Sequence, residues 1–459
     1  MSVFSAKAAV ARSAAVASRL AGRGATSVPG SVLLQLDQHA IARLAAGLRR
    51  GSVVISATNG KTTTAALAGS ILARAGITTV DNFAGANMAG GIASALLAAR
   101  GRAGALSGEL GVFEVDEFWL APVAAELDPR VIVLSNLFRD QLDRYGELET
   151  IGERWAGVVA GSSARLVLGA DDPLVAYLGV GAQEPLYFGI EDPNVARSTG
   201  LAHAADSTQC RRCGGAYRYA HVYVGHLGVY ECSNCGLRRP QPGVSAHNVV
   251  LEGARSARFE LRTPAGSGTV TLALPGLYNV YNALAAAALA TALEIPLATI
   301  VDGLGAAPAM FGRAELVLIG KRELQILLIK NPAGANEVLR TLALEPGEHD
   351  LLGVLNDQIA DGRDVSWIWD ADFEEFAPRV RHVTCAGTRA PELALRLKYA
   401  GVPTTRIALE PNLARALDAA VAAAPEDGKL YALPTYTAML ELREVLGRRG
   451  QATNFWDRT

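Results

Sequence analysis

Short apolar runs alternate with longer Ala- and Leu-rich stretches along most of the chain. Each run is followed by polar turn residues and then by a segment of helical composition. The clearest runs are residues 53–56, 131–134, 166–168, 352–355 and 382–385. Because strand-then-helix alternation is typical of parallel sheets covered by helices, the pattern predicts an α/β protein.

Two stretches depart from this alternation. From about residue 199 to 243, cysteines, tyrosines and glycines replace the pattern, which indicates an insertion. Residues 257–274 then alternate apolar and polar positions as antiparallel strands do, and a long alanine-rich helix begins near Asn279. Gly, Pro and Ala cluster at residues 306–312, so we expect a domain boundary there.

The composition narrows the class of protein. At 459 residues the chain is long enough for two or three domains, and half of its residues are apolar. Its net charge of −2 gives no electrostatic case for binding nucleic acid or an anionic membrane surface. It has no run of about 18 uninterrupted apolar residues, so we expect no membrane span. The residues before Asp37 lack acidic side chains and are compatible with a transit peptide or an amphipathic arm.

A phosphate-binding loop is the most informative motif. The apolar run 53–56 leads into Ala57-Thr58-Asn59-Gly60-Lys61-Thr62-Thr63-Thr64, and a helical stretch follows. A strand that turns sharply into a helix directs backbone N–H groups at an anion, while the lysine reaches terminal phosphates and a threonine hydroxyl binds Mg²⁺. The motif therefore predicts a nucleotide site, in a shortened form that has Ile55 where the general loop has its first glycine. An ordinary strand-to-helix turn is the alternative.

Four of the five cysteines form two close pairs, Cys210 with Cys213 and Cys232 with Cys235. Four thiolates at this spacing hold Zn²⁺ tetrahedrally and leave no open position, which predicts a structural zinc site. A redox pair and a nucleic-acid-binding zinc ribbon are the alternatives, and neither has the surrounding sequence in its favour. The clustering is unlike a disulfide framework and fits a reducing cytoplasm.

Carboxylates follow two of the predicted strands. Glu114 ends an apolar stretch and is followed closely by Asp116 and Glu117. Doubly wound sheets bind ligands at the carboxyl ends of their strands, and Mg²⁺ on ATP phosphates needs one or two carboxylate oxygens. We therefore predict Glu114 as a magnesium ligand, with a solvated strand end as the alternative. Residues 136–146 are a second candidate for such a site. The alternative is that their charges lie on an exposed helix face.

The densest polar segment is residues 355–370, which contains Asp357, Asp361 and Asp364 after an apolar strand. A second α/β domain would present a site at this position, although a helix cap and a loop salt bridge use the same residue types. No Ser–His or Cys–His set accompanies the segment. A catalytic aspartate here would therefore have its partners on another polypeptide. Cys385 ends an apolar strand and is interpreted as structural.

Several of these motifs together resemble the Mur ligase family over nearly the whole chain. The motifs are residues 58–64, 85–88, 114–117, 138–144 and 278–283, and the cysteine insertion, residues 330–334 and residues 360–367 narrow the resemblance to the amidating ligases of that family. The resemblance implies a Mur ligase-type ATP-binding domain with a parallel sheet and a zinc-ribbon insertion, followed by a second Rossmann-like α/β domain. The implied ranges are a helical arm at 1–50, the ATP-binding domain at 51–308 with its insertion at about 199–243, and a C-terminal domain at 309–459.

The resemblance also implies an activity. It is the ATP-dependent amidation of the α-carboxylate of D-glutamate in the lipid II stem peptide, which gives D-isoglutamine through an acyl phosphate. Ammonia would come from a GatD-type glutamine amidotransferase subunit that contacts the C-terminal domain, in the cytoplasm or at the inner face of the membrane. The alternatives are a Mur- or folylpolyglutamate-type ligase that adds an amino acid, and a zinc-ribbon NTPase that binds nucleic acid.

Residue roles follow from the same resemblance. Thr62 and Glu114 would bind Mg²⁺, Zn²⁺ would occupy the four cysteines, and Asp364 would complete a Cys–His–Asp arrangement with the partner's cysteine and histidine. Two residues depart from the family pattern. Gln141 stands where many of these ligases have a metal-binding histidine, which puts a second Mg²⁺ in doubt. Ala57 stands where a glycine is common at the start of the phosphate loop. The implied ATP-binding set is Asn59, Gly60, Lys61, Thr62, Thr63, Asn279 and Arg313.

Overall fold

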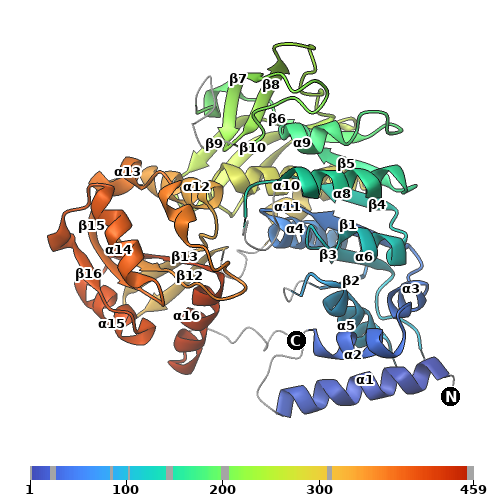
Figure 1. The fold of residues 1–459 in the computed structure, drawn as a ribbon, viewed down its shortest axis with the longest axis horizontal. Coiled ribbons are helices and arrows are strands. Elements are labelled where there is room, and N and C mark those ends of the chain that lie inside the picture. The colour runs from blue at the N-terminus through green and yellow to red at the C-terminus, as the bar shows by residue number, and fades with distance from the viewer. Residues whose placement is uncertain are drawn as a thin grey trace.

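The computed structural model describes residues 3–20, 27–82, 86–101, 104–140, 148–197, 206–307 and 313–451, without the side chains of 15–20, 313 and 314. Its strands form a nine-stranded sheet, a six-stranded sheet and a separate hairpin. Figure 1 shows the six-stranded sheet and its helices, in orange and red, beside the body built on the larger sheet. The predicted α/β class, with one sheet in each of two successive α/β units, is therefore confirmed.

The nine-stranded sheet has the order β11-β10-β9-β6-β5-β4-β1-β3-β2. Its strands are parallel from β9 to β2, and β10 and β11 continue the sheet antiparallel. The predicted parallel runs and the predicted antiparallel pair are thus confirmed. The strands are β1 (Ser52–Ser56), β2 (Thr79–Asp81), β3 (Leu110–Glu114), β4 (Val131–Leu134), β5 (Arg165–Gly169), β6 (Leu186–Ile190), β9 (Val244–Glu252), β10 (Ser256–Thr263) and β11 (Gly266–Leu272).

Helices cover this sheet, and one of them is buried on almost every side. That helix, α10 (Leu277–Ala292), packs against α4 and against β5 and β6. Its alanines allow close approach, and a helix that is apolar all round belongs in a core. The other helices of this body are α4 (Lys61–Arg74), α5 (Ala89–Ala99), α6 (Leu120–Leu127), α8 (Leu148–Ala160), α9 (Pro173–Tyr177), η1 (Pro193–Val195) and α11 (Leu297–Gly305).

The N-terminal helices pack on the outside of the same body, as Figure 1 shows in blue. They are α1 (Val3–Leu20), α2 (Val28–Leu36) and α3 (Ala40–Ala45). Helices α2 and α5 approach closely, because a Cβ added at Gly30 would lie 1.9 Å from the Gly90 carbonyl oxygen. No helix in the described ranges is both long and apolar enough to cross a membrane.

The cysteine-containing insertion lies between β6 and β9. It forms a hairpin of β7 (Tyr217–Val224) and β8 (Leu227–Cys232), which we call the cysteine hairpin. A small core of its own holds it together, formed by Cys210, Tyr217, Tyr219, Val222, Tyr230 and Cys232 with Ala176. Residues 198–205, at the predicted start of the insertion, lie outside the described residues.

The second sheet has the order β12-β13-β17-β14-β15-β16, parallel except for the antiparallel pair β12–β13. The predicted runs at 352–355 and 382–385 fall in β14 and β15, and most of the predicted boundary at 306–312 lies outside the described residues. The strands are β12 (Arg313–Ile319), β13 (Arg322–Leu327), β14 (His349–Val354), β15 (Val380–Ala386), β16 (Ile407–Leu409) and β17 (Lys429–Pro434). The helices are α12 (Pro332–Ala343), η2 (Ser366–Trp369), α13 (Phe373–Phe376), η3 (Ala377–Arg379), α14 (Ala390–Tyr399), η4 (Thr404–Arg406), α15 (Leu413–Ala423) and α16 (Tyr436–Arg448).

Candidate active site

The predicted phosphate loop joins β1 to α4, with Gly60 just before the helix. Gly60 has φ +92°, and a Cβ there would lie 1.9 Å from Asn282 Oδ1 on α10. Only glycine fits both the backbone and the space. The first backbone N–H groups of α4 therefore point out of the loop, as an anion site requires.

Lys61 begins α4 and is surrounded by acidic groups. Its Nζ donates to Glu117 Oε2 at 2.8 Å and to the Ala57 carbonyl oxygen, and its side chain is only 12% exposed. Burial alone would lower the pKa of Lys61, but the carboxylates of Glu117, Asp116 and Glu114 raise it above its ordinary value. Lys61 is therefore charged, with a carboxylate in the place that a phosphoryl oxygen would take.

The predicted magnesium ligand, Glu114, ends β3 beside β1 and is 2% exposed. The charges of Lys61 and Glu117 both influence the pKa of the Asp140 carboxyl. Asp140 therefore adds a second carboxylate to the same region. Burial raises the pKa of Asp140, and Lys330 partly offsets this effect. Thr62 follows Lys61 in the first turn of α4 and is half-buried. These oxygens suit a hard divalent cation such as Mg²⁺.

Residues 136–138 hold the phosphate loop in place. The Thr58 N–H donates to the Asn136 carbonyl oxygen at 3.0 Å, and the Asn59 N–H donates to Asn136 Oδ1 at 2.9 Å. The Phe138 N–H in turn donates to Thr58 Oγ1 at 3.0 Å. The loop is thus fixed by its neighbour after β4. Gln141, which follows this segment, lies outside the described residues.

The smaller sheet contributes to the site through the residues just before α12. Lys330 Nζ donates to the Thr58 carbonyl oxygen at 3.1 Å and forms an ion pair with Asp140. The amides of Asn59 and Asn331 bond to each other, with Asn331 Nδ2 donating to Asn59 Oδ1 at 3.0 Å. A second lysine therefore reaches the phosphate loop from a separate sheet.

An interdomain pocket lies beside the loop, with a volume of about 100 Å³. This volume is below the range of about 300–1,000 Å³ that is usual for ligand pockets. Its lining comes from the phosphate loop, α10, the cysteine hairpin and the C-terminal body: Asn59, Gly60, Thr63, Asn136, Phe138, Val224, Leu227, Tyr278, Tyr281, Asn282, Leu327, Leu328, Lys330, Ala333, Gly334, Glu337 and Val338.

Three of the predicted nucleotide ligands, Lys61, Thr62 and Asn279, do not line this pocket. Asn279 is buried at the start of α10, where its Nδ2 donates to the Pro275 carbonyl oxygen at 2.7 Å. It accepts a 3.0 Å bond from Asn282 Nδ2, so it orients Asn282, which does line the pocket. Arg313 begins β12, and its side chain lies outside the described residues.

The four predicted zinc ligands come together as expected. Their sulfur atoms all lie within 4.8 Å of one another, and among the described residues no other His, Cys, Asp and Glu group has this geometry. Backbone N–H groups of Asn234 and Cys235 donate to Cys232 Sγ at 3.4 and 3.5 Å. Hydrogen bonds from the Gly215 backbone and from Asn234 lower the pKa of Cys213 to about 6, which favours the thiolate. The donor set fits Zn²⁺.

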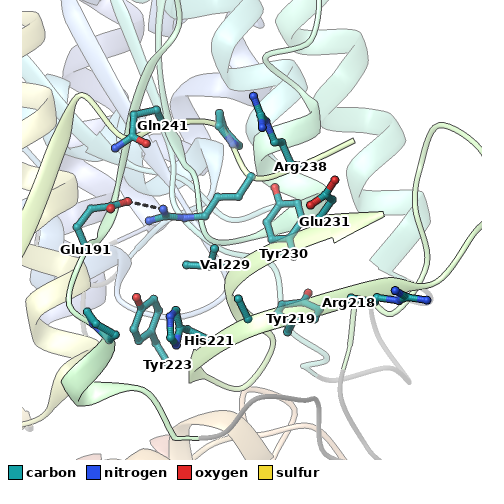
Figure 2. A pocket seen from close by; sticks show the side chains of 14 residues that line it. Glu191, Arg218, Tyr219, His221, Tyr223, Val229, Tyr230, Glu231, Arg238 and Gln241 are labelled. Carbon is teal, nitrogen blue, oxygen red and sulfur yellow. Dashed lines mark hydrogen bonds and ion pairs between the residues drawn. The ribbon is translucent and has the colours of Figure 1, made fainter. Parts of the chain in front are cut away.

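A second, larger cavity of about 1060 Å³ is lined mainly by residues of the cysteine hairpin (Figure 2). Figure 2 shows His221 and Tyr223 together near Glu191, with Arg218 and Glu231 farther along the hairpin. No phosphate-loop residue lines it, and its buried Arg239 is already bonded to Asp171 and Glu191. Of the two pockets, the smaller interdomain one is therefore the one that adjoins the phosphate loop.

The three aspartates after β14 have different surroundings. Asp357 pairs with Arg389 at 2.8 Å, and buried Asp361 accepts from the Thr437 N–H at 2.8 Å. Asp364 is exposed and accepts from Ser366, whose hydrogen bonds lower the pKa of the Asp364 carboxyl. Asp364 is therefore an ionised group facing solvent.

Cys385 does not supply a nucleophile to this region. It is fully buried in β15, and burial raises the pKa of its thiol to about 12. The interpretation of Cys385 as structural agrees with this environment.

Sequence reasoning missed two residues of the site. Glu117, the partner of Lys61, belongs to the acidic run that begins at Glu114, but nothing in the sequence of that run shows which carboxylate pairs with the lysine. Lys330 was noted only as part of a motif, because no local pattern shows that a residue near 330 reaches a loop near 60. Both are tertiary contacts between segments distant in the sequence.

The architecture and the site define a Mur ligase-type enzyme. The Mur ligase middle domain model matches residues 55–236, and the MurT ligase C-terminal model matches residues 328–439. Among solved structures, a pseudomurein peptide ligase type C from Methanothermus fervidus is 24% identical, with a TM-score of 0.65 and 88% of this chain and 79% of that chain covered. MurF from Thermotoga maritima with ADP has a TM-score of 0.62 at 15% identity, with 90% and 84% covered.

Two curated relatives show which family of Mur ligases the chain resembles along nearly its whole length. A lipid II isoglutaminyl synthase (glutamine-hydrolyzing) subunit MurT from Streptococcus pneumoniae is 36% identical over 95% of this chain and 94% of its own length. Its counterpart from Staphylococcus aureus N315 is 33% identical over 96% and 97%. The chain belongs to the MurT family of Mur ligases.

Proposed function

We propose that this chain is the ligase subunit of a lipid II isoglutaminyl synthase, and that it amidates the α-carboxylate of D-glutamate in the stem peptide. Similarity to MurT subunits along nearly their whole length supports this substrate. A carboxylate resists attack by ammonia until ATP converts it into an acyl phosphate. The enzyme must therefore neutralise the transferred phosphoryl oxygens.

The observation that carries the proposal is the convergence of two lysines on one phosphate loop. Lys61 comes from the loop itself and Lys330 from the opposite body, and both are paired with carboxylates that phosphoryl oxygens can replace. Closure of the two bodies brings the second lysine to the nucleotide. We assign residues 51–308 to the ATP-binding domain and 309–459 to the domain that closes on it.

Mg²⁺ would be held by Glu114 and Thr62, with Asp140 as a further ligand. Asp140 Oδ1 is buried and makes no hydrogen bond to the described residues, which is the state expected of a metal-facing oxygen. Mg²⁺ would supply charge neutralisation of the phosphates. Zn²⁺ at the four cysteines would fill all its positions with protein thiolates and take no part in the chemistry.

The ammonia source is a second polypeptide in this proposal. No described cysteine pairs with a histidine as a nucleophile would, and the exposed Asp364 is free to orient a histidine on a partner. A GatD-type glutamine amidotransferase subunit fits that requirement, since the third member of a Cys–His–Asp arrangement fixes the tautomer of the histidine. We place the reaction in the cytoplasm, at the membrane face where lipid II lies.

The test is to purify the chain with its amidotransferase subunit and incubate lipid II, ATP and amide-¹⁵N glutamine. Mass spectrometry should find ¹⁵N in the α-carboxamide of D-isoglutamine. Incorporation of a whole amino acid instead would favour a ligase of the folylpolyglutamate type and contradict the proposal.

Asp364→Asn separates the two half-reactions. We expect glutamine hydrolysis to fall by about 10⁴-fold, as for the aspartate of other triads, while the complex still assembles and free ammonia restores amidation. Asp370→Asn, an exposed neighbour, is the control. Normal glutamine hydrolysis by Asp364→Asn would remove this residue from the mechanism and make Asp357 or Asp361 the next candidate.

A further inference from the structure

The turn of the cysteine hairpin contacts residues 136–140, far from the cysteines themselves. The His226 and Phe138 rings are 4.7 Å apart, and a Cβ added at Gly225 would lie 2.7 Å from Phe138 Cε1. Gly225 has φ +58°, so neither the backbone nor the contact accepts a side chain there. The turn is therefore fitted closely against Phe138.

His226 joins the turn to the same segment through two carboxylates. The imidazole is fully buried, with Nε2 3.2 Å from Asp172 Oδ2 and Nδ1 3.9 Å from Asp206 Oδ2. The same oxygens accept backbone N–H groups of the segment, from Leu137 at 2.8 Å and from Arg139 at 3.0 Å. The hairpin, the two aspartates and residues 137–139 thus form one network.

This network ends at the phosphate loop, because residues 136–138 hold Thr58 and Asn59. The two residues that flank the turn, Val224 and Leu227, also line the interdomain pocket together with Gly60. The hairpin therefore provides an apolar wall of the pocket, beside the loop that would bind a nucleotide's phosphates. An apolar wall next to a phosphate loop suits a purine base.

We propose that the turn of the cysteine hairpin is part of the nucleotide site, where Val224 and Leu227 contact the adenine base of ATP and His226 positions residues 136–140. The proposal rests on the ATP-dependent function proposed above. It gives the insertion a role in nucleotide affinity besides its role as a metal-stabilised unit.

The test compares two substitutions of the same residue type in one hairpin. Val224→Ala removes part of the pocket wall, whereas Val229→Ala alters β8 at a residue that lines the other cavity. Calorimetry on the full-length, zinc-loaded chain measures binding of MgATP and of magnesium tripolyphosphate, which has no base. Zinc content and melting temperature are measured for each variant.

We expect Val224→Ala to bind MgATP about tenfold more weakly, because two methyl groups leave the base contact, and to bind tripolyphosphate normally. Val229→Ala should bind both ligands like the parent chain. Equal MgATP affinity in the two variants would overturn the proposal, and so would an equal loss of both ligands in Val224→Ala, which would indicate general damage to the loop.

A measurement on the unsubstituted chain covers the case in which Val224→Ala fails to fold. Photolysis of bound 8-azido-ATP should label a peptide within residues 217–232, and labelling confined to other peptides would overturn the proposal. The same titrations separate a failure of this proposal from a failure of the proposed function. If the parent chain binds neither MgATP nor magnesium tripolyphosphate, the ATP-dependent function itself is wrong.

Discussion

At the scale of single residues, the ion pair of Lys61 with Glu117 makes it possible to measure the effect of Lys61 on catalysis apart from its effect on stability. Lys61→Ala should lower ligation at least about 100-fold, because the charge that develops on the phosphoryl oxygens loses a cation. It also leaves Glu117 buried without its 2.8 Å partner, so we expect a lower melting temperature. The double variant Lys61→Ala/Glu117→Gln should recover stability without recovering activity. Arg74→Ala, exposed at the end of α4, is the control, and full activity in Lys61→Ala would contradict the mechanism.

His226 predicts how stability depends on pH. Burial alone would lower the pKa of His226, but Asp172 and Asp206 outweigh both burial and the nearby Arg139 and raise it. A raised pKa in the folded state means that this stabilisation is complete below the ordinary value of about 6.5 and is lost as the pH rises through the folded value.

Denaturant unfolding at about pH 6 and about pH 8.5 measures this effect. The parent chain should lose more stability between the two values than His226→Gln, whose side chain does not titrate. Identical losses in both proteins would show that the imidazole is neutral in the folded state.

At the scale of elements, the cysteine hairpin should depend on its metal. Cys232→Ser should lower zinc content and melting temperature together, because the metal's binding energy contributes directly to the folding of such a small unit. Ser233→Ala, an exposed neighbour, should change neither quantity. A zinc-free Cys232→Ser protein with the parent's melting temperature would refute the structural role.

At the scale of the whole molecule, the contact of Lys330 with the phosphate loop predicts that catalysis depends on how the two bodies meet. Lys330→Ala should lower ligation about 100-fold, since it removes a cation from the transferred phosphate. Lys321→Ala changes an exposed lysine of the same body and should be neutral. Measured rates with lipid II, ATP and ammonia test this directly, and equal rates in the two variants would exclude Lys330 from the reaction.

Patterns within short segments of the sequence predicted the local structure, but they did not predict the contacts between segments that are distant in the sequence. The strand before the phosphate loop, Gly60 at its turn and the four cysteines could all be predicted, because each follows from spacing within a short segment. The partners of Lys61 and His226 could not, since Glu117 and Asp172 lie more than 50 residues away from them. The contact of Asn331 with Asn59 spans 272 residues, so no sequence window contains it.

The ion pair between Lys330 and Asp140 has a consequence for the order of ligand binding. If phosphoryl oxygens drew Lys330 away, Asp140 would lose its cation and become a better ligand for Mg²⁺. A metal held by Asp140 would likewise free Lys330 for the nucleotide. The two binding events would then be thermodynamically linked, so each ligand would raise the affinity for the other by the same factor. Either ligand alone must compete with a contact that the protein already makes within itself, and together they replace it.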